Sequence, residues 1–311
     1  MSVRRHFRIR SLQFLYAQHL SKMDSNKVEE NMLRSIESLH HLYIFLLYLI
    51  LKIRENAMKK KLCNQNHKTD FIQKFAYNSV IKILSKNKYL IEEYRSTKNS
   101  EKILWNQQYE YIFIFLQKMQ KSNFYKKYSI KSSSSFEEEK KFIIKYYKNF
   151  VIPNKKLIEY IEDLYYFHGE EDLYIAHTMV CKTLQCINYS TPKNFKLYNI
   201  YKDDENKKFV INLYRNTIFH KEEFNRLIND ISCNWDIKRI AIIDLIILQM
   251  ATCEFLYFPN IPPKATMNEY IEITKIFCME KSKIFINGIL DQIFKFLYKK
   301  NRIFKIGKGL I

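Results

Sequence analysis

Apolar side chains recur at helical spacing along most of this chain. In the first segment Phe7, Leu12 and Leu15 recur near helical spacing, a pattern typical of an amphipathic helix. Only four glycines and five prolines interrupt the 311 residues, so long helices and an all-α fold are expected. The clearest helices are predicted at about 3–21, 26–62, 203–219, 237–256, 266–277 and 285–299.

The region from 64 to 200 has less distinctive patterns, which we interpret as further helices. Ser135 and Glu138 have the spacing of a capping box, so a helix is expected to begin there. A loop is expected at Thr191, which precedes a proline. Aromatic residues are dense between 105 and 115 and throughout this region. They fit either a stacking surface for single-stranded RNA or, as their helical spacing favours, a packed core.

The formal net charge of +20 indicates an anionic partner, either nucleic acid or an anionic membrane surface. Charge alone does not decide the matter, because lysine shares A- and T-rich codons with the abundant Ile, Asn, Tyr and Phe. The placement of the charge is more informative. Arg4, Arg5, Arg8 and Arg10 lie at the start of the first predicted helix, where the helix dipole is already positive. They form either a solvated helix end or a surface that binds phosphate.

Catalytic and metal-binding motifs are absent from the sequence. It contains no glycine-rich nucleotide loop, no His-Glu-x-x-His and no Gly-x-Ser-x-Gly, so neither an enzyme nor a cofactor is expected. No two of the six cysteines have the Cys-x-x-Cys spacing, which argues against a zinc site and suits a reducing cytoplasm.

No membrane span is expected either. The apolar run at 42–51 is shorter than a bilayer crossing, and the longer run at 240–258 contains Asp244, Gln249 and Glu254. The arginine-rich start lacks the uninterrupted apolar stretch and cleavage site of a signal peptide.

The stretch at 261–293 resembles the signature of the NusB family. It contains a proline-lysine turn that ends at Lys264, the pair Asn268-Glu269, the pair Ser282-Lys283, and Phe-Ile-Asn-Gly-Ile-Leu-Asp from Phe285 to Asp291. The opening RRHFRIRSLQFLYA resembles the arginine-rich start of the same family. The two matches cover about 3–55 and 235–300, so the chain is similar to a long NusB with a central insertion.

The resemblance implies a NusB-like helical bundle with additional helices from the insertion. The expected parts are N-terminal core helices at 1–63, a helical insertion of unknown role at 64–200, and a C-terminal subdomain with a basic tail at 201–311. Gly288 is expected to allow close approach of the first helix, which would bring its arginines near a short junction at 280–285.

The resemblance also implies a function. Family members bind boxA-type single-stranded RNA together with NusE, a small-subunit ribosomal protein, and join the RNA polymerase antitermination complex that supports ribosomal RNA transcription. The expected protein-partner residue is Asp244. The expected RNA-binding residues are Arg4, Arg5, Arg8, Arg10, Lys281, Lys283 and Phe285.

Three alternatives remain at this point. A ribosome-assembly or ribosomal-RNA-associated binding protein would lack antitermination activity. An insertion that binds something unrelated would act independently of Arg4 to Arg10. A NusB-like domain also occurs in ribosomal RNA cytosine methyltransferases, but this sequence has neither their Pro-Cys motif nor a glycine-rich strand-to-helix turn.

Overall fold

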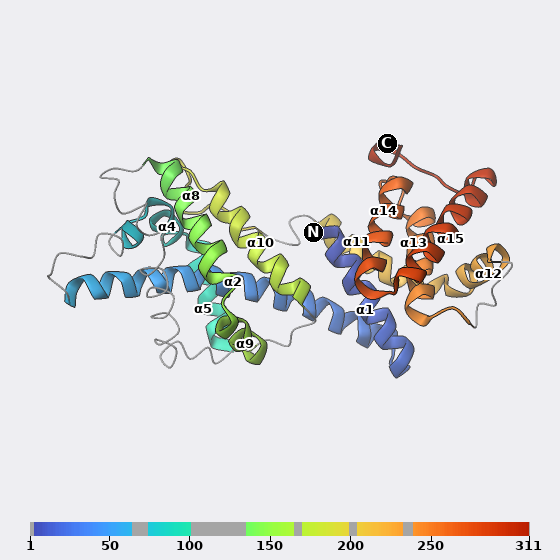
Figure 1. Cartoon of the computed structure of the whole chain (residues 1–311), viewed down its shortest axis with the longest axis horizontal. Coiled ribbons are helices and arrows are strands. Elements are labelled where there is room, and N and C mark those ends of the chain that lie inside the picture. The colour runs from blue at the N-terminus through green and yellow to red at the C-terminus, as the bar shows by residue number, and fades with distance from the viewer. Residues whose placement is uncertain are drawn as a thin grey trace. The chain divides into compact units, whose positions relative to one another are not determined.

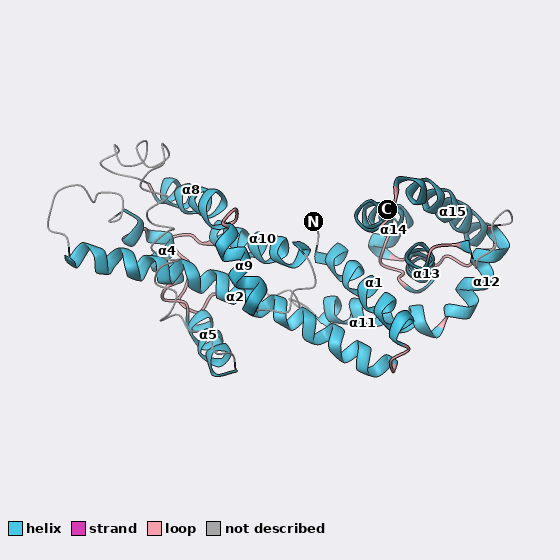
Figure 2. Ribbon diagram, turned by 60° about the horizontal axis from the view of Figure 1, so that its bottom comes forward, coloured by secondary structure: helices cyan, strands magenta, loops and turns pink. Residues whose placement is uncertain are grey.

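The computed structural model describes residues 3–63, 74–100, 135–164, 170–198, 204–232 and 239–310. Every regular element among these residues is helical, which confirms the predicted all-α class (Figure 2). The chain forms two compact units. The terminal unit comprises Met1–Arg34 with Tyr201–Ile311, and the central unit comprises Ser35–Ile200. The domain boundaries proposed from the sequence stay a prediction.

Helix α13 is the centre of the terminal unit (Figure 1). It packs against α1, α11, α12, α14 and α15, and its residues from Ile246 to Phe255 are all buried. An apolar helix that is buried all round belongs in a protein core, which accounts for the hydrophobic run seen in the sequence. The helices of this unit are α1 (Val3–Ser21), the start of α2 (Ser25–Cys63), α11 (Asp204–Phe219), α12 (Lys221–Ile231), α13 (Ile242–Tyr257), α14 (Pro263–Phe277) and α15 (Glu280–Lys299), followed by the short 3-10 helix η4 (Gly307–Leu310).

Three local expectations for this unit are wrong. Helix α13 begins at Ile242 instead of 237, because Ala241 has an extended backbone with ψ of 140°. The expected N-cap Asp236 lies outside the described residues. The junction expected at 280–285 is the first turn of α15, since Met279 is the extended N-cap. Gly288 is exposed and a Cβ there would meet nothing within 4 Å, so it receives no neighbouring helix.

The central unit has a core of its own along most of α2. Tyr43 on α2 is buried and its hydroxyl lies 2.6 Å from that of Thr183. The predicted capping box of Ser135 and Glu138 is confirmed at the start of α8. The expected aromatic stretch at 105–115 lies outside the described residues. The other helices are α4 (Ser79–Leu84), α5 (Lys88–Ser100), α8 (Phe136–Tyr146), the π-helix η2 (Tyr147–Val151), α9 (Lys155–Leu164) and α10 (Glu170–Cys186).

Helix α2 is the one helix in the described parts of the chain that is long and apolar enough to cross a membrane. Its apolar window is 61% buried within the protein. A core helix of this length passes the same test, so the finding is weak evidence for a membrane span.

Candidate nucleic-acid interface

The four arginines at the start of α1 differ greatly in depth. The side chain of Arg4 is 41% exposed and that of Arg5 is 23% exposed, whereas Arg8 and Arg10 are buried. Rotation by about 100° per residue places Arg10 on another face of α1. Arg8 lies on nearly the same face as Arg4 but one turn further along, where it is buried against Glu254. The basic surface predicted for α1 is therefore narrower than its sequence indicates, and it consists of Arg4 and Arg5.

Arg8 forms a forked ion pair with Glu254 in the core of the terminal unit. Its Nε and Nη2 atoms lie 2.8 and 2.6 Å from the two carboxylate oxygens. Glu254 also accepts hydrogen bonds from Thr266 (2.8 Å) and Tyr270 (3.3 Å), so its carboxylate is fully satisfied. Burial acts to lower the pKa of Arg8, but the charge and hydrogen bonds of Glu254 outweigh it, and the pKa is raised. This pair fixes α1 to α13.

Arg10 lies against the protein interior and is 1% exposed. Its Nη1 donates to Oε1 of Gln13, one helical turn further along α1, at 3.0 Å. Its guanidinium therefore stabilises the local packing of α1 and does not face solvent.

Arg5 connects α1 to α14. Its Nε and Nη2 donate to the carboxylate of Glu269 at 2.7 and 3.0 Å, and its Nη1 lies 3.7 Å from Glu272. The hydrogen bond to Glu269 raises the pKa of Arg5 against a smaller opposing effect of burial. Arg4 makes a looser pair with Glu205 of α11 at 3.6 Å, and its guanidinium lies 5.7 Å from the centre of the Phe209 ring.

Basic side chains from three helices meet around Glu272. Lys275 donates a hydrogen bond to this carboxylate, and the charges of Lys275, Arg5 and Lys283 add to that bond in lowering the pKa of Glu272. We call Arg5, Glu272, Lys275 and Lys283 the junction cluster. Arg5 of α1 lies 3.7 Å from Glu272, Lys275 bonds to it within α14, and Lys283 of α15 acts on it through its charge. The arginine-rich opening and the start of α15 are therefore linked electrostatically through α14, and not by packing at Gly288.

The first turn of α15 adds further charge and exposed apolar surface. Lys281 is exposed, and Lys283 pairs with Glu280 at 2.8 Å. Met279 and Ile284 are 82% and 72% exposed, which is unusual for apolar side chains of this size. Phe285 is half-buried. The cluster therefore lies beside an apolar surface that is open to solvent.

Asp244 lies in the first turn of α13, where the helix dipole favours a carboxylate. It is 6% exposed. The thiol of Cys278, which follows α14, hydrogen-bonds to it, and burial together with that contact raises the pKa of Cys278 to about 12. The structure thus gives Asp244 an internal partner.

Sequence reasoning missed several members of this site. Glu269 and Glu272 are spaced three residues apart and so share a face of α14. Two carboxylates on one face could have been predicted to pair with the arginines of the first helix. Lys275 continues that face by one turn. Met279 and Ile284 had no such signal, because nothing in the sequence shows that they are exposed.

Comparisons with known proteins match part of the chain to one family. The model of the NusB family matches residues 180–295. The chain is 40% identical over 109 residues to "Transcription antitermination protein NusB" of Salinibacter ruber, covering 35% of this chain and 68% of that protein. Proteins of the same name from Chloroherpeton thalassium and Syntrophus aciditrophicus are 34% and 44% identical, over 36% and 26% of this chain. The aligned regions span 54% and 51% of those two proteins.

One solved structure, titled "T. maritima NusB, P3121, Form 2", is 31% identical to the chain. The match covers 32% of this chain and 70% of the other, with a TM-score of 0.29. At that score the superposition supports no structural argument.

Proposed function

Because this chain belongs to the NusB family, we propose that it is a transcription antitermination factor that binds boxA-type single-stranded RNA together with NusE. In this proposal it acts in the cytoplasm by binding and not by catalysis. It joins the RNA polymerase antitermination complex and supports ribosomal RNA transcription. The observation that carries the proposal is the junction cluster, where Arg5, Lys275 and Lys283 come from three helices beside the exposed side chains of α15.

Single-stranded RNA offers both phosphates and exposed bases. The surface around the start of α15 has basic side chains for the phosphates and apolar side chains for the bases. The phosphates are assigned to Arg4, which is only loosely paired, to the exposed Lys281, and to Lys283. Lys283 is half-buried and pairs with Glu280 of its own helix, whose side chain is 77% exposed, so in this proposal a phosphate takes the place of Glu280. The bases are assigned to the apolar surface of Met279 and Ile284, with Phe285 beside it, because unstacked bases gain from contact with apolar side chains.

The other arginines have a positioning role in this proposal. Arg8 and Arg10 are buried, so an RNA phosphate could reach them only if α1 moved away from the core. Arg5 is bound by two carboxylates, and it sets the position of Glu269 and Glu272 next to the lysines. The sequence predicted direct RNA contacts for Arg8 and Arg10. In this proposal they act indirectly, by holding α1 in place.

The contact with NusE is proposed near Asp244, on the side of α13 that faces Cys278. Since Asp244 is almost fully buried, it acts by fixing the start of α13 for the partner. A ribosome-assembly factor without antitermination activity would use the same protein contact, but it would show no preference for boxA.

Fluorescence anisotropy with a boxA-like RNA and a scrambled RNA tests the proposal, with and without NusE, at about 0.15 M salt, where weak surface electrostatics are screened. We expect NusE to strengthen binding to boxA much more than to the scrambled strand. Equal binding to both strands would remove the RNA-specific part of the proposal. NusE binding without RNA selectivity would favour the assembly alternative.

A matched pair of variants on α15 tests the surface itself. Lys283→Glu is expected to weaken boxA binding about 10-fold, because it removes one phosphate contact and adds a repulsion. Lys295→Glu is the control, since Lys295 is likewise paired with a carboxylate of its own helix and lies about 18 Å further along it. If the two substitutions weaken binding equally, the junction cluster is not the RNA site.

A further inference from the structure

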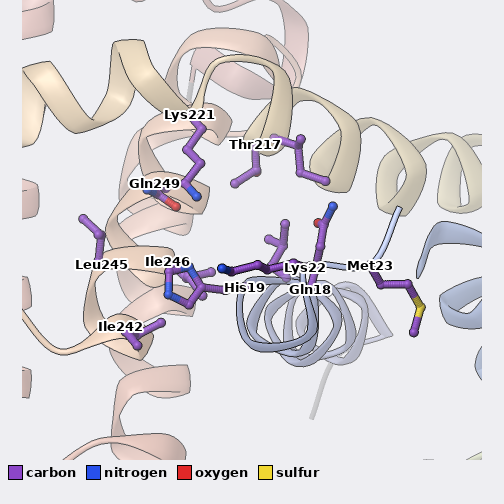
Figure 3. Close-up of a pocket in the computed structure, with 12 residues that line it drawn as sticks. Gln18, His19, Lys22, Met23, Thr217, Lys221, Ile242, Leu245, Ile246 and Gln249 are labelled. Carbon is purple, nitrogen blue, oxygen red and sulfur yellow. The ribbon is translucent and has the colours of Figure 1, made fainter. Parts of the chain in front are cut away.

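Figure 3 shows a pocket whose volume is about 450 Å³. It lies beside the end of α1, whereas Arg5 of the junction cluster lies in the first turn of that helix. Its apolar part includes Leu15 of α1, Ile218 of α11 and Ile246 of α13. Arg5 and Gln18 are separated by thirteen residues of helix, or about 20 Å, so the pocket and the proposed RNA surface are distinct sites. The volume is within the range of pockets that bind ligands.

Three basic side chains from two segments line the same pocket. His19 and Lys22 come from the end of α1, and Lys221 begins α12 (Figure 3). No acidic residue lines the pocket within the described parts of the chain. Both lysines are exposed, and neither has an acidic partner among the described residues. The two lysine charges repel each other across the apolar part of the pocket. An anionic ligand bound between them would attract both and offset that repulsion.

The backbone at Lys22 has a φ of 53°, the left-handed conformation that usually belongs to glycine at the end of a helix. Its backbone N–H bonds to the carbonyl of Gln18 at 2.9 Å and closes the last turn of α1. A lysine in this position places a cation at the edge of the pocket at some conformational cost.

Part of the apolar surface of the pocket is exposed. Met23 and Ile242, which line the pocket, are 40% and 37% exposed. Exposed apolar residues with polar neighbours are a feature of sites that bind other proteins. A single strand of RNA is a poorer match, because the described residues that line the pocket include no Phe, Tyr, Trp or Arg on which bases stack, and His19 is their one aromatic ring.

We propose that this pocket binds an acidic peptide segment of a partner protein. One or two aliphatic side chains of the segment fill the floor formed by Leu15, Ile218 and Ile246, and its carboxylates pair with Lys22 and Lys221. A basic partner has the wrong sign of charge for this site. Asp244, near which NusE is placed above, points to the other side of α13 from Leu245 and Ile246, toward Cys278.

The test begins with a displayed library of random twelve-residue peptides selected on the immobilised full chain. We expect enrichment of peptides that combine aspartate or glutamate with leucine or isoleucine. A selected peptide is then labelled and its affinity is measured by anisotropy on the wild type and on variants. Enrichment of basic peptides, or of none above background, overturns the proposal.

The variants change charge and shape separately. Lys22→Glu with Lys221→Glu is expected to weaken peptide binding at least about 10-fold, whereas the control Lys299→Glu with Lys300→Glu makes the same charge change elsewhere and leaves binding unaltered. Ile218→Trp fills the pocket without a charge change and is expected to abolish binding. Thermal unfolding checks that each variant is folded. If the lysine reversals weaken boxA binding and leave peptide binding intact, the pocket belongs to the RNA and the proposal fails.

Discussion

The Arg8–Glu254 pair shows how an arginine predicted to bind RNA stabilises the fold instead. Removing only Arg8 leaves a carboxylate with 0% side-chain exposure and without the guanidinium that pairs with it. We expect Arg8→Met to lower the free energy of unfolding of the terminal unit by about 3–5 kcal/mol, measured by urea unfolding. The control Arg4→Met breaks an exposed pair and should cost less than about 1 kcal/mol. If Arg8→Met with Glu254→Leu is no more stable than Arg8→Met alone, the pairing argument is wrong.

His177 in the central unit makes a second residue-scale prediction. Burial lowers its pKa to about 4, and its Nδ1 lies 2.7 Å from the Tyr147 hydroxyl. Above the ordinary pKa of 6.5 the ring is neutral in both states. Between about 6.5 and 4 only the unfolded chain takes up the proton, so the stability that is present above 6.5 is lost as the pH falls.

The loss reaches about 3 kcal/mol near pH 4. Urea unfolding at pH 7 and pH 4.5 measures it, with His177→Gln as the comparison because glutamine retains a hydrogen-bonding group but does not titrate. A wild type and variant that lose the same stability on acidification would show that His177 is not responsible.

At the scale of elements, apolar spacing predicted the helices well where it was uninterrupted. The bounds of α1 and α11 agree with the sequence within one residue, because the apolar spacing continues without interruption through each of them. The starts of α13 and α15 were missed because they depend on the backbone conformations of Ala241 and Met279, which side-chain patterns do not encode.

The segment that follows α15 contacts the end of α13. Nζ of Lys305 donates to the carbonyl oxygens of Glu254 (3.2 Å) and Phe258 (2.9 Å), and the backbone N–H of Ile306 donates to Pro259 (3.1 Å). These bonds satisfy carbonyls at the end of α13 that have no partner within the helix. Lys305→Met should therefore lower the unfolding free energy by about 1–3 kcal/mol, whereas the exposed Lys299→Met should lower it by less than about 0.5 kcal/mol. Equal effects in thermal or urea unfolding would mean that the segment does not stabilise α13.

At the scale of the molecule, the sequence indicated where the site lies but not which arginines reach solvent. The partners that bury Arg8 and hold Arg5 are Glu254 and Glu269, about 250 residues further along the chain. Local patterns contain no information on such distant pairs. The family resemblance predicted that both ends of the chain contribute to one site. Which of their side chains are exposed depends on packing, which the sequence pattern does not show.

The difference between the total charge of the chain and the few basic side chains at the proposed site predicts how RNA affinity depends on salt. A net charge of +20 suggests a steep dependence, but the surface proposed here offers about three phosphate contacts, from Arg4, Lys281 and Lys283. Each neutralised phosphate of a single strand contributes a slope of about −0.7 to log K against log salt, so we expect a slope of about −2. Anisotropy with boxA RNA between about 0.05 and 0.3 M salt measures it. A slope of about −5 or steeper would show that lysines far from the junction cluster also bind the backbone, and the +20 charge, not the placement of a few side chains, would then set the affinity.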